Sequence, residues 1–473
     1  MNFPARVLAA TVLILLGLPL SSLSQSAASS LLPDILVTAA PVYQPLAALS
    51  GGERFPNGST LLLIHSGKAE PLLPAFAASA DANVSFDGET VLFAGRKSVS
   101  DPWQIWELTL ATRAVRRVTS TTTDAIRPLY LPSAQPGGHL VYAQRTSGGF
   151  QLENARAIEL EPIYASQDPQ AAQVQLTYLR ASAVPADVLA DGRILFEAGF
   201  PLSTGRIPEL FLVYSDGSGV ESYRCDHGVA RWGGKQLSSG DVVFTHGATL
   251  ARFTSPLAHE AAIAAPVAQY AGAIAETASG AWLVSARATA ATHYSLKLWE
   301  AGRPDLQTVL AVAGKDLVEP VLVAPRPRPN RHPSGLHDWS YANLLALDAR
   351  QSRAGDLKTA PTLVRLETQD ANGHTVVSGT APVEPDGSFF VKVPGDTPIR
   401  FILLDQKGAV MRQEHGWFWI RRGEQRICVG CHTGPERASE NRVPAVLMRT
   451  TIPADLTAST PAANPQIKSP GGN

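Results

Sequence analysis

Two cysteines and a histidine near the carboxyl end of the chain have the spacing of a haem attachment motif. Cys428, Cys431 and His432 form C-x-x-C-H, in which two thiols add to the vinyl groups of a porphyrin and the adjacent imidazole binds the iron. The thiols could instead form a disulfide or half of a zinc site, but zinc needs two more ligands at similar spacing and no second C-x-x-C follows. The spacing therefore predicts haem c, bound covalently through Cys428 and Cys431, with His432 as the proximal ligand.

The ligand on the other side of the iron would determine what the haem does. His415 precedes the motif closely enough to fold back over the ring, and the alternative is a surface turn histidine. Met411 and Met448 are the other nearby candidates, and both are otherwise expected in the core. A filled sixth position favours electron transfer, whereas an open position allows a small molecule to bind the iron.

Aromatic and basic residues lie between these candidates and the cysteines. Residues 417–419, Trp-Phe-Trp, are expected to shield the porphyrin edge from water. They could also be ordinary core aromatics, and both can hold. Arg421, Arg422 and Arg426 suit the haem propionates, because a guanidinium fork fits a carboxylate, or they form a solvated charge run.

A second metal site is conceivable at Cys225-Asp226-His227. Side chains alternate faces along a strand, so Cys225 and His227 could converge on one ion, and His246 stands one expected strand away. The alternative is a buried free cysteine beside a turn. With Cys428 and Cys431 in thioethers, Cys225 is the odd cysteine of three, which fits the haem interpretation better than a disulfide framework.

The amino-terminal residues predict export. Arg6 precedes an almost uninterrupted apolar run over residues 7–20, and small residues follow, as in a signal peptide. We expect residues 1–28 to be removed, with an uncleaved anchor as the alternative, and a periplasmic or secreted protein with no membrane span after cleavage. Covalent haem is attached after export, so the signal and the motif support each other.

Composition and an internal repeat predict a mainly β fold. The chain has 17% charged residues, a net charge of −1, 38 glycines and 36 prolines, which gives no electrostatic case for nucleic acid and favours turns over helices. A turn dipeptide precedes a short apolar strand five times, about 40–55 residues apart, which is the period of a four-stranded propeller blade. The copies are Asp87-Gly88 with 90–93, Gly137-Gly138 with 140–142, Asp191-Gly192 with 194–196, Ser239-Gly240 with 242–244 and Ser279-Gly280 with 282–284.

We therefore expect a β-propeller over residues 29–325, with a pair of sandwiches or a β-helix as the alternatives. Alternating prolines after residue 324 predict a stiff connector, and close-spaced strands with Asn-Gly and Asp-Gly turns predict a small β-sandwich within residues 326–412. A c-type haem segment follows over residues 413–450. Residues 451–473 are low in hydrophobicity and are expected to be a disordered tail.

The order of these parts resembles a known family. The S-D-G-S-G hairpin at 215–219 is similar to those of TolB-like propellers, and residues 382–389, 397–401 and 423–432 resemble hydrazine synthase alpha-subunit-like proteins. The resemblance implies a propeller, a small β-domain and haem attachment. The named enzyme is a multi-subunit, multihaem complex that makes hydrazine from nitric oxide and ammonium, whereas the three cysteines here allow one haem held by two thioethers.

Two functions follow as expectations. The first is single-electron transfer by a periplasmic haem c protein that docks a redox protein partner on its propeller. The second is a haem-dependent oxidoreductase of the hydrazine-synthase-like type that acts on a small nitrogen or oxygen compound. A haem sensor is a third option.

Overall fold

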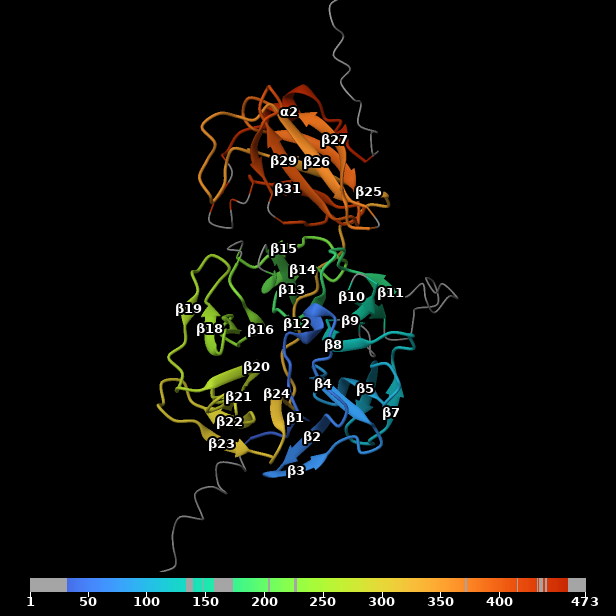
Figure 1. The fold of residues 1–473 in the computed structure, drawn as a ribbon, viewed down its shortest axis with the longest axis vertical. Helices are drawn as coiled ribbons and strands as arrows, with labels where there is room; N and C mark the ends of the chain where they lie inside the picture. The colour runs from blue at the N-terminus through green and yellow to red at the C-terminus, as the bar shows by residue number, and fades with distance from the viewer. Residues whose placement is uncertain are drawn as a thin grey trace, which may run out of the picture.

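The computed structural model describes residues 32–132, 139–147, 149–156, 173–202, 205–224, 228–370, 372–414, 416–431, 433, 437–438 and 440–457. Within them the chain forms eight four-stranded sheets. Six sheets are arranged around a common centre and the other two form a second domain beside the ring (Figure 1). The mainly β class, with a propeller followed by a small sandwich, is confirmed.

The six sheets of the propeller are each antiparallel. Five of them use consecutive strands: β4 (Ala78–Val84), β5 (Thr90–Arg96), β6 (Gln104–Thr109), β7 (Val115–Arg117); β8 (Ala125–Leu131), β9 (His139–Thr146), β10 (Gly149–Arg156), β11 (Gln173–Gln175); β12 (Ala183–Val188), β13 (Ile194–Leu202), β14 (Gly205–Val213), β15 (Glu221–Ser222); β16 (Trp232–Gln236), β17 (Val242–His246), β18 (Thr249–Phe253), β19 (Ala261–Ala262); β20 (Gln269–Glu276), β21 (Trp282–Arg287), β22 (Ser295–Trp299), β23 (Gln307–Leu310).

The sixth sheet is made from both ends of the propeller. Its strands are β24 (Asp316–Leu322), β1 (Ile35–Ala40), β2 (Thr60–His65) and β3 (Lys68–Pro71), in that spatial order. Ile35 lies opposite Leu322 in the antiparallel pair of β1 and β24. The ring is thus closed by hydrogen bonds between its first and last strands, so no sheet is left open.

The apolar runs of the five repeats all occupy the same place in their sheets, although the Gly137-Gly138 turn of the second copy lies outside the described residues. Each apolar run falls in the second strand from the centre, namely β5, β9, β13, β17 or β21. Gly88, Gly192, Gly240 and Gly280 in the preceding turns have φ between 80° and 90°, which a residue with a Cβ rarely adopts. In these four sheets the repeat therefore marks the turn that leads outward from the inner strand.

The inner strands carry bulges that turn charged side chains toward the axis. The register shifts within β4, β8 and β24, and Asp81, Arg127 and Glu319 there have φ of 58°, 58° and 57°. Arg54, from the loop after β1, donates to Asp81 at 2.6 Å and pairs with Glu319. Arg127 pairs with Glu319 at 2.8 Å, and the Tyr43 hydroxyl donates to Glu319 at 2.7 Å. These side chains are almost fully buried. Because the basic and acidic groups pair with one another, their opposite charges offset the cost of burial inside the ring.

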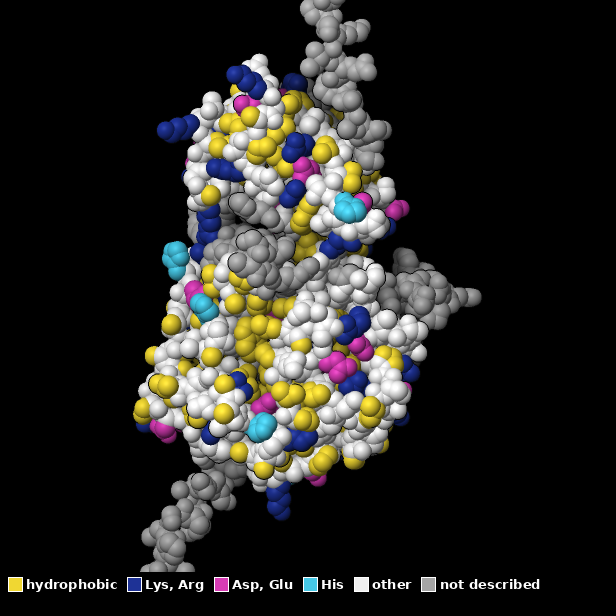
Figure 2. All heavy atoms as spheres, in the orientation of Figure 1, with side chains coloured by type: hydrophobic (Ala, Val, Ile, Leu, Met, Phe, Trp, Pro, Cys, Tyr) yellow, Lys and Arg dark blue, Asp and Glu magenta, His cyan; other side chains and the backbone are white. Residues whose placement is uncertain are grey.

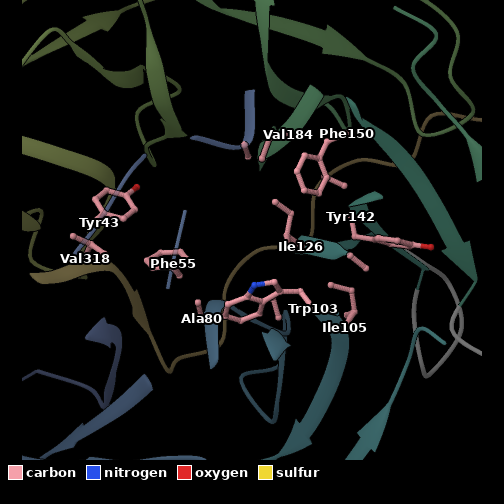
Figure 3. Close-up of a cluster of buried hydrophobic side chains, with 14 of the residues drawn as sticks. Tyr43, Phe55, Ala80, Trp103, Ile105, Ile126, Tyr142, Phe150, Val184 and Val318 are labelled. Atoms are coloured by element: carbon pink, nitrogen blue, oxygen red, sulfur yellow. The ribbon is translucent and has the colours of Figure 1, made fainter. Parts of the chain in front are cut away.

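The loop between β1 and β2, which includes the 3-10 helix η1 (Ala47–Ser50), fills the middle of the ring. Tyr43 and Phe55 from this loop lie among side chains of several blades, with Trp103, Ile126 and Phe150 on the facing side (Figure 3). The central core of the propeller is therefore built on a segment that belongs to no blade.

The second domain consists of two four-stranded sheets. One sheet has the order β31 (Gln425–Cys428), β25 (Tyr341–Ala346), β28 (Phe389–Pro394), β32 (Ala454–Asp455). The other has the order β27 (Thr375–Pro382), β26 (Leu363–Gln369), β29 (Ile399–Leu404), β30 (Val410–Gln413), and a short helix α2 (Ala445–Arg449) precedes β32. Phe389, Val391 and Val393 point into the shared core while the residues between them are partly exposed, the alternation of a half-buried strand.

Two expectations for the carboxyl end need correction. The separate segment expected over residues 413–450 is not separate from the sandwich: it contributes β31, which pairs in parallel with β25 of a sandwich sheet. The disordered tail expected from residue 451 is wrong for its first residues: β32 pairs with β28, and Leu456 is buried in the sandwich core. Residues 458–473 lie outside the described residues, as do residues 1–31.

The connector between the domains runs over the propeller. Arg326 donates its backbone N–H to Phe86 O at 2.9 Å, and Asn330 does the same to Ala190 O at 2.8 Å. Residues 323–340 thus cross two outward turns of the ring before they reach the sandwich (Figure 1). Acidic and basic side chains alternate over the described part of the face in Figure 2, with no broad area of one sign. No helix among the described residues is long and apolar enough to cross a membrane.

Candidate haem attachment site

The first cysteine of the motif ends an edge strand of the sandwich. Strand β31 has one partner, β25, and Cys428 lies opposite Ala346 in this parallel pair. Ile427 is 66% exposed, whereas Cys428 packs against the sandwich core, because successive side chains alternate faces. The pairing continues past the strand, since Leu347 donates its N–H to Cys428 O at 2.9 Å.

The turn between the two cysteines has no room for a side chain at its glycine. A Cβ added to Gly430 would lie 2.6 Å from Thr433 Cγ2 and 2.8 Å from Gln351 O. It would also lie 2.9 Å from Asp348 O. The loop after β25 therefore fixes the path of the C-x-x-C turn, and both cysteines contact the same apolar core.

Both motif thiols are free rather than joined in a disulfide. Burial, followed by the carboxylate of Glu414 and the neighbouring Cys428, raises the pKa of Cys431 to about 12, although Arg412 opposes the shift. Burial also raises the pKa of Cys428. Burial thus keeps both thiols protonated at neutral pH. No group of three potential metal ligands occurs among the residues that the structure describes.

Four expected site residues lie outside the described residues: His432, His415, Cys225 and His227. After burial, the carboxylate of Glu414 is a further cause that raises the pKa of both motif thiols. Glu414, which follows β30, therefore lies near the motif. His246, which might have joined Cys225 and His227, has its Nδ1 within hydrogen-bond distance of a Glu260 carboxylate oxygen.

The two methionine candidates differ in how far they are buried. Met411 is half-buried on β30. Met448 is 77% exposed on α2, so the expectation of a core methionine is wrong. Helix α2 has five residues and turns one side inward, burying Val446 and leaving Met448 outside.

The aromatic run before the motif serves packing. Trp419 is fully buried in a propeller cluster, with its ring centroid 6.2 Å from that of Tyr178. Phe418 packs against the sandwich core, and Trp417 lies under the guanidinium of Arg400 at 4.7 Å. Of the two alternatives for this run, core packing applies to Trp419 and Phe418.

The three nearby arginines have protein carboxylates as partners. Arg421 and Arg422 both bind Asp396, and Arg426 binds Glu424 at 2.8 Å. Arg421 and Arg426 are thus largely buried beside their carboxylate partners, whereas Arg422 is 61% exposed.

Sequence reasoning missed how the segment after the motif is held. Asp386 accepts a hydrogen bond from Ala445 N, 2.8 Å away at the start of α2, and also binds the Arg442 guanidinium. Ser388 Oγ accepts from Val446 N at 3.1 Å. The Asp-Gly pair at residues 386–387 predicts a turn, but only the tertiary structure brings this turn next to α2.

The comparisons with known proteins agree with this architecture. Residues 349–433 match the family model of the hydrazine synthase alpha subunit middle domain. The solved structure of Kuenenia stuttgartiensis hydrazine synthase is similar in fold, with a TM-score of 0.75 at 17% identity, covering 88% of this chain and 71% of that one. TolB from Acinetobacter baumannii has a TM-score of 0.41 at 11% identity, over 61% of this chain and 66% of that one.

No curated protein matches the chain. The matched middle domain includes the sandwich strands β26 to β31 and both motif cysteines. The expected resemblance is confirmed: the chain is similar to the hydrazine synthase alpha subunit, with a propeller fold followed by residues that match the model of that subunit's middle domain.

Proposed function

We propose that this chain is an exported haem c protein with a role like that of the hydrazine synthase alpha subunit. Cys428 and Cys431 would hold one haem by two thioethers, and His432 would bind its iron. The observation that carries the proposal is the pair of free, adjacent thiols on either side of a turn that has no room for a Cβ. These residues fit a group bound by two thioethers, and the match at residues 349–433 supports the assignment.

Bound haem would exchange single electrons with a redox protein partner in the periplasm. The chain's own residues would fix where the porphyrin sits. Strand β31 anchors the first thiol to the sandwich, and the loop over residues 348–351 holds the turn that carries the second. The propeller would offer a docking platform for the partner.

A second candidate is favoured by the family match: oxidation or reduction of a small nitrogen compound at an open iron. The fold similarity to a hydrazine synthase supports this class of reaction. The small-molecule reaction would require a haem iron with one free coordination position, whereas electron transfer is favoured when all six positions are filled.

The test is to produce the chain with cytochrome c maturation enzymes and to record its pyridine haemochrome spectrum and its CO binding. We expect a c-type haemochrome with one haem per chain, and loss of covalent haem in Cys428→Ser and Cys431→Ser. Reduced iron that ignores CO supports electron transfer, and ready CO binding supports the small-molecule reaction. Absence of covalent haem in the native chain would refute both.

A further inference from the structure

The segment just before the cysteines is fixed to the propeller as well as to the sandwich. Trp419 is fully buried against blade residues. Arg421 donates from Nε to Asp216 O at 3.1 Å and from Nη1 to the Tyr178 hydroxyl. Its Nη1 also binds Asp396 of the sandwich. One guanidinium, 12% exposed, thus joins the two domains.

The blade hairpin that receives this segment is shaped for it. A Cβ added to Gly217 would lie 3.2 Å from Arg421 Cδ, in a position where φ is already +84°. The N–H of Gly219 donates to Glu424 Oε1 at 3.3 Å, and Glu424 also accepts from Arg421 N at 3.0 Å and from Arg426 Nε at 2.9 Å. The S-D-G-S-G hairpin therefore holds the backbone that leads directly into β31.

We infer that Arg421 is a positioning residue, through which the propeller sets the place of the haem attachment strand. The inference deepens the proposed function and, where it concerns haem, rests on it. Neighbouring Arg422 binds the same Asp396 carboxylate through its N–H and its Nε, both within the sandwich, and is 61% exposed. Of these two arginines, Arg421 is therefore the one that bridges to the propeller, because its guanidinium also reaches Tyr178 and Asp216.

The first measurement needs no haem. Hydrogen exchange is compared in native chain, Arg421→Met and Arg422→Met, all produced without maturation enzymes. We expect Arg421→Met to raise exchange severalfold in residues 417–427 and in the hairpin at 215–219 together, with Arg422→Met close to native in both. Tyr178→Phe, which removes one hydroxyl partner, should give a smaller rise in the same two segments. Equal exchange in Arg421→Met and Arg422→Met would overturn the inference.

The second measurement uses the haem-loaded full chain. We expect Arg421→Met to shift the midpoint potential and the Soret maximum relative to the native protein, with Arg421→Lys partly restoring both and Arg422→Met leaving both near native. A potential that is the same in Arg421→Met and Arg422→Met would overturn the positioning role. Absence of haem in the native chain refutes the proposed function instead, while the exchange comparison still decides the bridge.

Discussion

Asp386 illustrates how single hydrogen bonds shape this domain. Its carboxylate is partly buried, which by itself would raise its pKa, but hydrogen bonds from Ser388, Ala445 N and Arg442 lower the pKa to about 2. An aspartate in an unfolded chain has a pKa of about 3.9. The native state therefore gains stability from this group at any pH above about 4, and loses it as the pH falls toward 2.

Replacing Asp386 with asparagine tests this balance. We expect Asp386→Asn to lower the free energy of unfolding near pH 7 by about 2 kcal/mol, because hydrogen bonds to a charged group are lost. The difference from the native protein should shrink as the pH falls through 4 to 2. Urea titrations across this range measure it, with Asp405→Asn as the control, since Asp405 caps only its own local turn at Lys407 N and Ala409 N. A constant difference at all pH values would contradict the assignment.

At the scale of elements, the C-x-x-C turn is limited by the loop beside it. Gly430→Ala places a Cβ within 3 Å of two backbone oxygens, so the turn must shift. We expect a loss of about 1–3 kcal/mol in stability, as for overpacking elsewhere, and a lower yield of covalent haem from the maturation system. Thermal melts and haemochrome yield report the two effects.

A matched control for this substitution is Gly335→Ala, where an added Cβ meets nothing within 4 Å. Gly335 lies in the connector, and neither Gly335 nor Gly430 has a left-handed backbone, so the two sites differ in the space around the added Cβ. A Gly430→Ala protein as stable and as rich in haem as Gly335→Ala would show that the turn has more freedom than its contacts indicate.

Elements were easier to predict from the sequence than their partners were. Five second strands were found by their turn dipeptides, because each such turn is local. The pairing of Ile35 with Leu322 has no local signal, so the sixth sheet stayed unassigned. In the same way, the sequence placed Trp419 beside the haem motif, but its burial among propeller residues depends on how the two domains dock. The spacing of Cys428 and Cys431 could be recognised, whereas the contacts of Arg421 could not.

At the scale of the whole molecule, Glu319 links the strand that closes the ring to the loop in its centre. Glu319→Gln removes the negative charge that faces both Arg54 and Arg127. We expect the free energy of unfolding to fall by about 3 kcal/mol, because a buried guanidinium without its partner is costly. Urea unfolding measures the change.

The control is Glu300→Gln, which removes an exposed pairing with Arg303. Exposed ion pairs contribute about 0–1 kcal/mol, so this variant should unfold like the native protein. If Glu319→Gln were equally silent, the central charges would add nothing to the stability of the ring.

The pairing of β24 with β1 also imposes an order in time. Synthesis delivers the amino end first, so β1 to β3 must wait for their neighbour until the chain has been made through Leu322. Contacts this distant in sequence form slowly, after the five locally paired blades. The cysteines emerge later still and belong to a strand with a single neighbour. We therefore expect an exported chain to present its thiols to the attachment enzymes while the last sheet of the propeller is still closing, with β31 pairing with β25 only afterwards.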